Sequence, residues 1–160
     1  MWVKSLCNPP IIRTFKIKNK NMTQFKSPQL TACFRQWKAE GTHCRFTHAY
    51  KVWFDIDFDQ DINDIFNLYP ELKLYLNEWF LFNFNYKTFV SESDPELDTF
   101  KYLDQNKIIS LITMPEVGCE RFSEYVLDGV NTILEQFDLD VKCVRVETWE
   151  HEKNSGVAYI

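Results

Sequence analysis

The segment from Gly41 to Tyr50 holds most of the residue types in this sequence that catalyse reactions. It contains Cys44 four residues before His48, with His43 next to the cysteine. A loop thiol near imidazoles can have a lowered pKa and act as a base or a nucleophile. The same spacing also fits a buried cysteine beside a surface histidine, so the motif alone leaves both interpretations open.

Few other residues are suited to chemistry. The 160 residues include 3 His and 5 Cys, and no two cysteines form a CxxC pair. Neither a disulfide framework nor a zinc knuckle is therefore indicated, and we expect reduced thiols in a cytoplasmic protein. The sequence also lacks a glycine-rich phosphate loop, HExxH, GxSxG and a kinase signature.

Charge divides the chain into two parts. Residues 1–22 carry five basic and no acidic side chains, whereas the whole chain has a net charge of -5. The acidic remainder argues against a nucleic-acid partner, and no apolar run is long enough for a membrane span. We expect a basic N-terminal extension over residues 1–21 and one domain over residues 22–160. A strand over residues 11–18 is the alternative for the extension.

Hydrophobic spacing predicts the elements that position the Cys44 segment. Residues 50–58 alternate between apolar and polar side chains, which is typical of a half-buried antiparallel strand, and Asp55 and Asp57 fall on its expected solvent face. An apolar run over residues 30–37 predicts a neighbouring strand, so that Cys44 lies in the loop between the two.

The rest of the chain predicts helices and further strands. Helical spacing covers residues 63–80, with Pro70 in the first turns, and residues 119–137; the remaining predictions are a short helix over 95–106 and strands over 108–113, 141–149 and 156–160. The main order is strand-strand-helix-helix-strand-strand. It predicts an α+β fold, with an antiparallel four-stranded sheet and two helices on one face.

A family resemblance follows from these motifs. The pattern Cys44-x-x-x-His48-Ala-Tyr50, followed by an alternating strand, resembles the Cys-x-x-x-His-Gly-His signature of the 6-pyruvoyl/6-carboxytetrahydropterin synthase family. The family's element order, known as the T-fold, is the order predicted above. Four more segments match family motifs in order: 30–34 (Phe-x-Ala-Ala-His), 84–89 (Leu-Asp-His-x-x-Leu), 115–122 (Pro-Thr-x-Glu-Asn) and 144–150 with Tyr159 (a strand, a Glu and a terminal Tyr).

The resemblance implies a catalytic apparatus of which this chain keeps part. The family's proton-transferring cysteine matches Cys44, for which His48 would be the partner. The Asp-His pair of the family's proton relay falls at Asn85 and Tyr86. Asn does not ionise and Tyr has a pKa near ~10, so this pair does not reproduce the relay near neutral pH.

The resemblance also implies a zinc ion held by three histidines. The matching positions are Phe34, His48 and Tyr50, so one imidazole stands where a catalytic zinc has three protein ligands. We therefore expect no cofactor, with zinc at His48 as the alternative.

For the ligand, the resemblance implies a pterin of the dihydroneopterin triphosphate type. Glu120 and Glu150 match the acids that hold the ring, with Glu147 as the alternative to Glu150. It further implies a lyase of the 6-carboxytetrahydropterin synthase kind, in a queuosine or biopterin pathway, that forms homo-oligomeric trimers or hexamers. The alternative is a catalytically inactive homologue that binds a pterin or purine or serves as an oligomeric scaffold.

Overall fold

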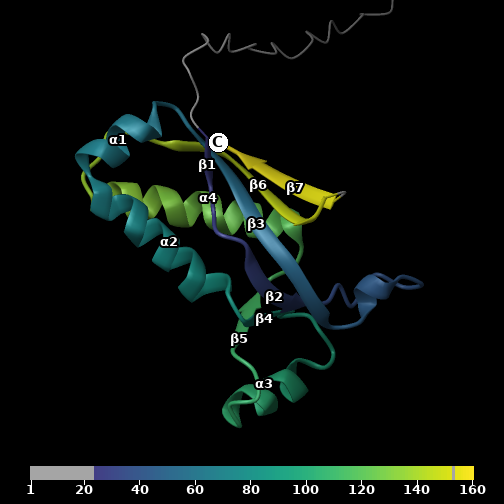
Figure 1. Cartoon of the computed structure of the whole chain (residues 1–160). Coiled ribbons are helices and arrows are strands. Elements are labelled where there is room, and N and C mark those ends of the chain that lie inside the picture. The colour runs from purple at the N-terminus through teal and green to yellow at the C-terminus, as the bar shows by residue number, and fades with distance from the viewer. Residues whose placement is uncertain (1–23, 153) are drawn as a thin grey trace, which may run out of the picture.

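A twisted sheet forms the centre of the part of the chain that the structure describes, residues 24–152 and 154–160 of a computed structural model (Figure 1). Neighbouring strands follow the order β5-β4-β2-β3-β6-β7, and β1 also pairs with β3. Their bounds are β1 Gln24–Lys26, β2 Leu30–Phe34, β3 His48–Phe58, β4 Lys87–Ser91, β5 Leu111–Met114, β6 Cys143–His151 and β7 Asn154–Tyr159. The predicted extension over residues 1–21, like the alternative strand over 11–18, lies outside the described residues.

The sheet is larger and more mixed than the four antiparallel strands expected from the sequence. Strands β2, β3, β6 and β7 pair antiparallel in that order, but β4 runs parallel to β2 and β5 runs parallel to β4. Strand β4 is buried continuously from Thr88 to Ser91. Strands inside parallel pairs do not alternate between apolar and polar residues, so a period of two gives no signal there.

The helices confirm most of the predicted spans. Helix α4 (Cys119–Gln136) and helix α3 (Leu97–Gln105) lie where they were expected, but the span 63–80 contains two helices, α1 (Ile62–Leu68) and α2 (Pro70–Phe84). Proline has no N–H for the helical ladder, so Pro70 starts α2 instead of continuing α1. In the described residues no helix has the length and apolarity needed to cross a membrane.

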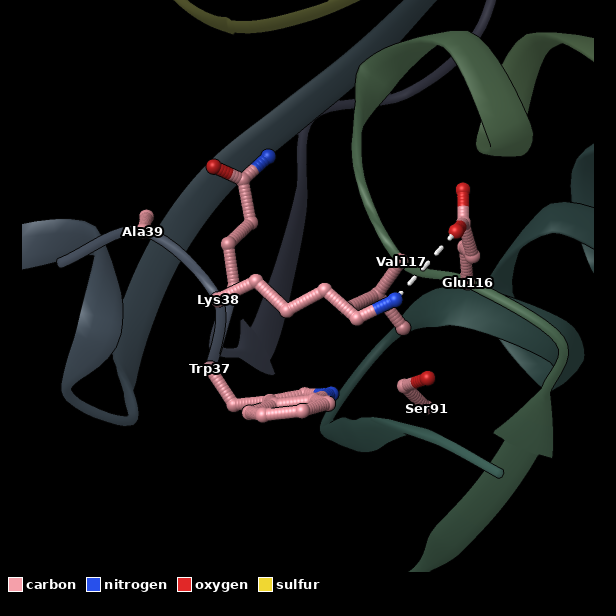
Figure 2. A pocket seen from close by; sticks show the side chains of 7 residues that line it. Trp37, Lys38, Ala39, Ser91, Glu116 and Val117 are labelled. Carbon is pink, nitrogen blue, oxygen red and sulfur yellow. Dashed lines mark ion pairs between the residues drawn. The ribbon is translucent and has the colours of Figure 1, made fainter. Parts of the chain in front are cut away.

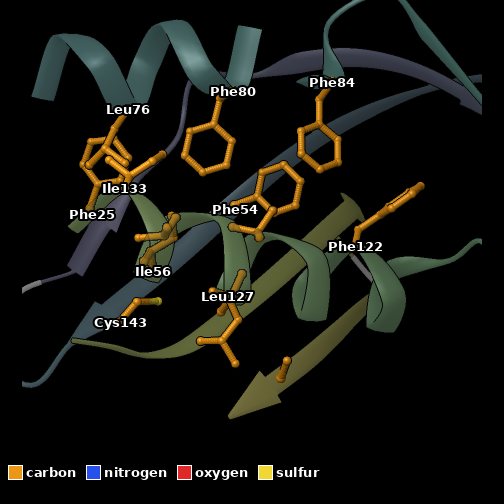
Figure 3. Close-up of a cluster of buried hydrophobic side chains, with 14 of the residues drawn as sticks. Phe25, Phe54, Ile56, Leu76, Phe80, Phe84, Phe122, Leu127, Ile133 and Cys143 are labelled. Atoms are coloured by element: carbon orange, nitrogen blue, oxygen red, sulfur yellow. The ribbon is translucent and has the colours of Figure 1, made fainter. Parts of the chain in front are cut away.

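The core lies between the sheet and helices α2 and α4, which cover the same face (Figures 1 and 3). Helix α4 contributes a buried stripe of Phe122, Val126, Val130 and Leu134. Helix α2 buries Leu72, Leu76, Phe80 and Phe84 and leaves Tyr75 exposed; Leu68, the last residue of α1, is exposed as well. Phe54 of β3 packs against both Phe80 and Phe84, at 5.2 and 4.7 Å between ring centroids.

The opposite face of the sheet carries a polar network. Asp55 was expected to be solvated, but it is 8% exposed, accepts a hydrogen bond from Trp149 Nε1 at 3.1 Å and pairs with Lys26 at 3.3 Å. Asp57 pairs with Arg145 at 3.1 Å. The prediction that Asp55 and Asp57 are solvated is therefore wrong, because strands β1 and β6 place cations and the Trp149 indole against this face of β3.

Candidate functional site

Three rings meet where β2 ends and β3 begins. His48 is the cross-strand partner of Phe34, since the two residues pair in the β2–β3 ladder. Tyr50, two residues further along β3, points to the same face. Its ring stacks on Phe34 at 4.2 Å between centroids and lies 4.1 Å from the His48 ring. Phe34 is 1% exposed and also packs edge-on against Phe122 of α4. The three positions matched to zinc ligands are therefore adjacent in space.

The loop that carries Cys44 lies beside these rings. It forms a short 3₁₀ turn over His43–Arg45, which a hydrogen bond from Gln36 N to Cys44 O at 2.8 Å ties to the end of β2. The imidazole nearest to the Cys44 thiol is that of His43, with 3.8 Å between Sγ and Nε2. Sequence reasoning favoured His48 in this place, although His43 is the direct neighbour in the chain.

The hydrogen bonding of His48 fixes its tautomer. Its Nδ1 lies 2.8 Å from the carbonyl oxygen of Phe46. A carbonyl oxygen only accepts, so Nδ1 carries the proton and donates, and Nε2 of a neutral ring remains free to accept. His48 thus presents an acceptor nitrogen at the end of the sheet, where its ring lies 5.6 Å from that of His43.

Tyr50 connects the loop to the far side of the site. Burial raises the pKa of its hydroxyl well above the ordinary value of 10.0, and the charges of Glu150 and Cys44 act in the same direction. Tyr50 therefore stays protonated at neutral pH, close to both a thiol and a carboxylate.

Glu150 at the end of β6 is the buried carboxylate of the site. It is 8% exposed, and its Oε1 accepts a hydrogen bond from Asn154 Nδ2 and lies 3.8 Å from His151 Nε2. Glu147, the alternative ring-holding acid, points to the other face of the sheet and binds Arg145 and Ser155 Oγ, the latter at 2.8 Å. Of the two candidates, Glu150 is the one that lies with Cys44 and Tyr50.

The first turn of α4 closes the site. Cys119 is buried, and burial, followed by the charges of Glu150 and Glu120, raises the pKa of its thiol above the ordinary 9.0. Glu120 is exposed on the same turn, where the helix dipole favours a negative charge.

A close approach of backbones keeps this turn in place. A Cβ on Gly156 of β7 would lie 2.3 Å from the backbone nitrogen of Glu120 and 2.6 Å from the carbonyl carbon of Cys119. Ser123 Oγ also donates to the Gly156 carbonyl at 2.7 Å. Only glycine allows β7 to lie this close to α4. This contact determines how close Cys119 and Glu120 lie to the sheet.

The two positions matched to the proton relay lie elsewhere. Asn85 Oδ1 accepts a hydrogen bond from Thr31 N at 3.0 Å, and Tyr86 N donates to Thr31 O at 2.6 Å. These contacts are at the beginning of β2, whereas Phe34 and the Cys44 loop are at its end. The Tyr86 side chain is 77% exposed. This pair joins α2 to the sheet and is not beside the thiol.

The donors at the site do not fit a three-histidine zinc centre. Phe34 has no ligand atom, and the Tyr50 hydroxyl keeps its proton because burial raises its pKa. Among the described residues no group of three His, Cys, Asp or Glu side chains has a metal-binding arrangement. The arrangement instead suits proton transfer and hydrogen bonding: Cys44, Tyr50, Glu150 and Cys119 come from four separate segments and form one cluster, called here the thiol–carboxylate cluster.

Sequence reasoning missed part of this cluster. The sequence predicts Cys119 only as the beginning of a helix, and no local motif marks Asn154. The signal available was Gly118-Cys119-Glu120 at the start of a strongly periodic helix, combined with Gly156 in a strand, since a glycine inside a strand often marks a close backbone approach.

Comparisons with known proteins give a fold but no closer relative. No protein-family model and no curated protein sequence matches the chain. Among solved structures, an uncharacterised protein from Wolinella succinogenes matches with a TM-score of 0.65 at 12% identity, over 86% of this chain and 98% of that one. The 6-pyruvoyl tetrahydropterin synthase of Caenorhabditis elegans matches with a TM-score of 0.52 at 10% identity, over 88% and 97% of the two chains.

A third match is a catalytic-residue variant of the 6-pyruvoyltetrahydropterin synthase of Plasmodium vivax, with a TM-score of 0.56 at 9% identity over 87% of this chain and 96% of that one. These matches span nearly all of the described residues and of their own chains. This protein therefore has the fold of the 6-pyruvoyl tetrahydropterin synthases, the T-fold expected from the sequence.

Proposed function

We propose that this chain is a tetrahydropterin synthase-like protein that binds a pterin at the end of strands β2 and β3 and transfers protons to or from it through Cys44. The observation that carries the proposal is the thiol–carboxylate cluster, in which Cys44 and Tyr50 lie close to Glu150 from a strand far along the sequence. The fold supports it, since solved structures with this fold include pterin synthases.

Glu150 is the residue proposed to hold the ring. The edge of a pterin presents two N–H donors side by side, and a carboxylate accepts both in a charge-assisted pair. Asn154 donates to Glu150 Oε1, which orients the carboxylate within the cluster. Glu120, exposed on the first turn of α4, is the second acid proposed to contact the ligand.

Cys44 is proposed to carry the proton. Its Sγ lies 3.8 Å from His43 Nε2, and the Tyr50 hydroxyl is close enough for the charge of Cys44 to act on it, so both groups are candidates to exchange a proton with the thiol. His48, with its free Nε2, is the second base of the site. Because the donor set does not fit zinc, each proposed step uses only these side chains.

The assembly and location follow the same proposal. A homo-oligomer, trimeric or hexameric, would place several copies of the cluster in one particle, and light scattering of the purified chain measures its mass directly. The reduced thiols Cys33, Cys44, Cys119 and Cys143 are free in the structure, which supports a cytoplasmic location.

Incubation with dihydroneopterin triphosphate tests the catalytic proposal. We expect turnover to a tetrahydropterin product, loss of turnover in Cys44→Ala, and nearly full activity in Cys33→Ala. Cys33 is the matched control because it is also a half-buried free thiol, on β2. Turnover that survives Cys44→Ala would remove this thiol from the mechanism.

A second candidate function is pterin or purine binding without turnover. The positions of Asn85 and Tyr86 favour it, since the pair matched to the family's acid–histidine relay lies at the beginning of β2, away from Cys44. A thermal-shift panel of pterins and purines measures binding in the absence of turnover. We expect the shift to be lost in Glu150→Gln and kept in Glu147→Gln, which changes the same strand on its other face. The opposite pattern would indicate that the ligand binds on the other face of the sheet, at Glu147.

A further inference from the structure

A hollow of about 320 Å³ lies outside the thiol–carboxylate cluster, between the segment that follows β2 and the turn that precedes α4 (Figure 2). Trp37 forms one side of it, and Glu116 and Val117 form the other. Ser91, the last residue of β4, lies beyond the N–H edge of the indole. The hollow therefore combines one flat aromatic surface with one carboxylate, drawn from segments about 80 residues apart.

The indole of Trp37 is held in one orientation. Its Nε1 donates to Ser93 Oγ at 3.3 Å, Ser93 Oγ lies 2.9 Å from Ser91 Oγ, and Ser91 Oγ donates to the carbonyl oxygen of Pro115 at 2.9 Å. This chain of hydrogen bonds connects the aromatic surface to the wall that carries Glu116. When a ligand stacks on the indole, the entropic cost of ordering the Trp37 side chain is therefore small.

The protein's own Lys38 crosses this hollow (Figure 2). Its Nζ lies 5.4 Å from the centroid of the Trp37 ring and 3.7 Å from Glu116 Oε1. A cation between an aromatic face and a carboxylate is the arrangement by which proteins hold organic cations. The Lys38 and Glu116 side chains are 61% and 56% exposed, so a ligand can separate them at small cost.

The charges around the hollow indicate which kind of ligand can take the place of the Lys38 side chain. Among the described residues, Glu116 is the one acid that lines it; its Oε1 faces Lys38, and its Oε2 lies 3.6 Å from an Arg121 nitrogen. A neighbouring hollow of about 580 Å³ shares Lys38 and Glu116 and adds Arg121 together with Glu124 and Asp128. The two hollows together have more acidic than basic side chains, so a phosphorylated ligand is disfavoured. A flat group with N–H donors along one edge satisfies both the indole face and the carboxylate.

We propose that this hollow binds a planar guanidine-type group, which stacks on Trp37, donates N–H bonds to Glu116 and displaces Lys38. Two sources carry this chemistry: a guanidinium cation, and the 2-aminopyrimidinone edge of an unphosphorylated ring such as neopterin. The proposal does not rest on the function of the thiol–carboxylate cluster, because the two sites use different acids, Glu116 and Glu150.

Calorimetric titration of the full chain with agmatine and, separately, with neopterin tests the proposal. We expect at least one probe to bind, about fivefold more tightly in Lys38→Met, because the internal competitor is gone. We expect Glu116→Gln to weaken binding at least tenfold, since a charge-assisted pair is lost. Glu116 is exposed, so this variant is expected to fold; Trp37→Leu removes the aromatic surface as a second check.

Two controls separate the alternatives. Lys101→Met removes another exposed lysine from an exposed ion pair, with Asp98, and is expected to leave the affinity unchanged. If neopterin binding were lost in Glu150→Gln and kept in Glu116→Gln, neopterin would bind at the thiol–carboxylate cluster. The proposal that a pterin ring occupies the hollow would then be wrong. Absence of binding by both probes in wild type and Lys38→Met, or binding that Glu116→Gln leaves unchanged, would overturn the proposal.

Discussion

The rings of Phe34 and Tyr50 stack with their centroids 4.2 Å apart, and His48 lies against the second ring. The register of β2 against β3 brings these three side chains to one place. Three neighbouring side chains therefore share one face of the sheet, and two of them, Phe34 and Tyr50, pack against each other. Placing imidazoles at these two positions would test whether the backbone geometry suits a metal.

The double variant Phe34→His, Tyr50→His is predicted to bind about one zinc ion per chain. Three imidazoles would then project from adjacent strand positions, which is a common catalytic zinc set. Loss of Phe34 packing costs about 3 kcal/mol of stability, so binding is best measured by metal analysis of protein whose folding has been checked by circular dichroism. Adding His48→Ala should abolish binding. A folded double variant without zinc, or a stoichiometric zinc in the wild type, would contradict the prediction.

Strong periodicity predicted much of the fold. Helix α4 and strand β3 have one buried and one polar face, so the spacing of Phe122, Val126 and Val130 or of Val52 and Phe54 identifies them without tertiary information. Strand β4 gave no such signal because neighbours bury both of its faces. Helix α2 is apolar on nearly all sides, so its sequence did not show that Phe80, and not Tyr75, faces the core.

The candidate site was predictable in its residues but not in its partners. Cys44 and Glu150 were found because local motifs mark them. Cys119 belongs to the site only because Gly156 lets β7 lie against the beginning of α4, a contact between segments 37 residues apart. Asp55 was mistaken for a solvated acid because its partners Lys26 and Trp149 come from other strands.

Asp94→Asn is predicted to destabilise the protein by about 3 kcal/mol. The Asp94 side chain has no exposed surface; it accepts hydrogen bonds from Arg35 Nε at 2.7 Å, from a second Arg35 nitrogen and from Glu96 N at 2.9 Å. The variant leaves the Arg35 cation without its counterion. Urea denaturation measures the loss, with Asp98→Asn as the control, because Asp98 is 98% exposed and its pair with Lys101 contributes little.

The same ion pair predicts a loss of stability in acid. Burial alone would raise the pKa of Asp94, but the hydrogen bonds and charge of Arg35 and the bond from Glu96 N hold it below the ordinary 3.8. The stabilisation is therefore present above that value and is lost as the pH falls through the lower, folded-state pKa. Asp94→Asn should flatten this part of the stability profile, and an unchanged acid slope would contradict the assignment.

Gly156→Ala is predicted to destabilise the protein by about 3 kcal/mol, because the new Cβ would meet backbone atoms of α4 that cannot move alone. Gly129→Ala is the matched comparison. There the Cβ would meet the Trp79 ring at 2.4 Å, but a side chain can shift, and alanine favours the helix by about 1 kcal/mol. Denaturation midpoints compare the two variants. An equal or smaller loss at Gly156 would mean that the approach of β7 does not hold the beginning of α4.

Stability is also predicted to fall in alkali through Cys143. Burial, the largest cause, raises the pKa of this thiol from its ordinary 9.0 to about 12. Between these values the folded protein keeps a proton that the unfolded chain releases, so the free energy of unfolding decreases as pH rises, by up to about 1.4 kcal/mol per pH unit. The stabilisation is complete below pH 9.

Cys143→Ala removes the titrating group, so its stability, although lower at pH 7, should fall less steeply between pH 9 and 11 in urea denaturation. Val146→Ala, a second fully buried position on β6, makes a cavity without removing a thiol and should keep the wild-type slope. If Cys143→Ala also kept that slope, the alkaline loss would have to come from other groups with raised pKa values, such as Cys119 and Tyr50.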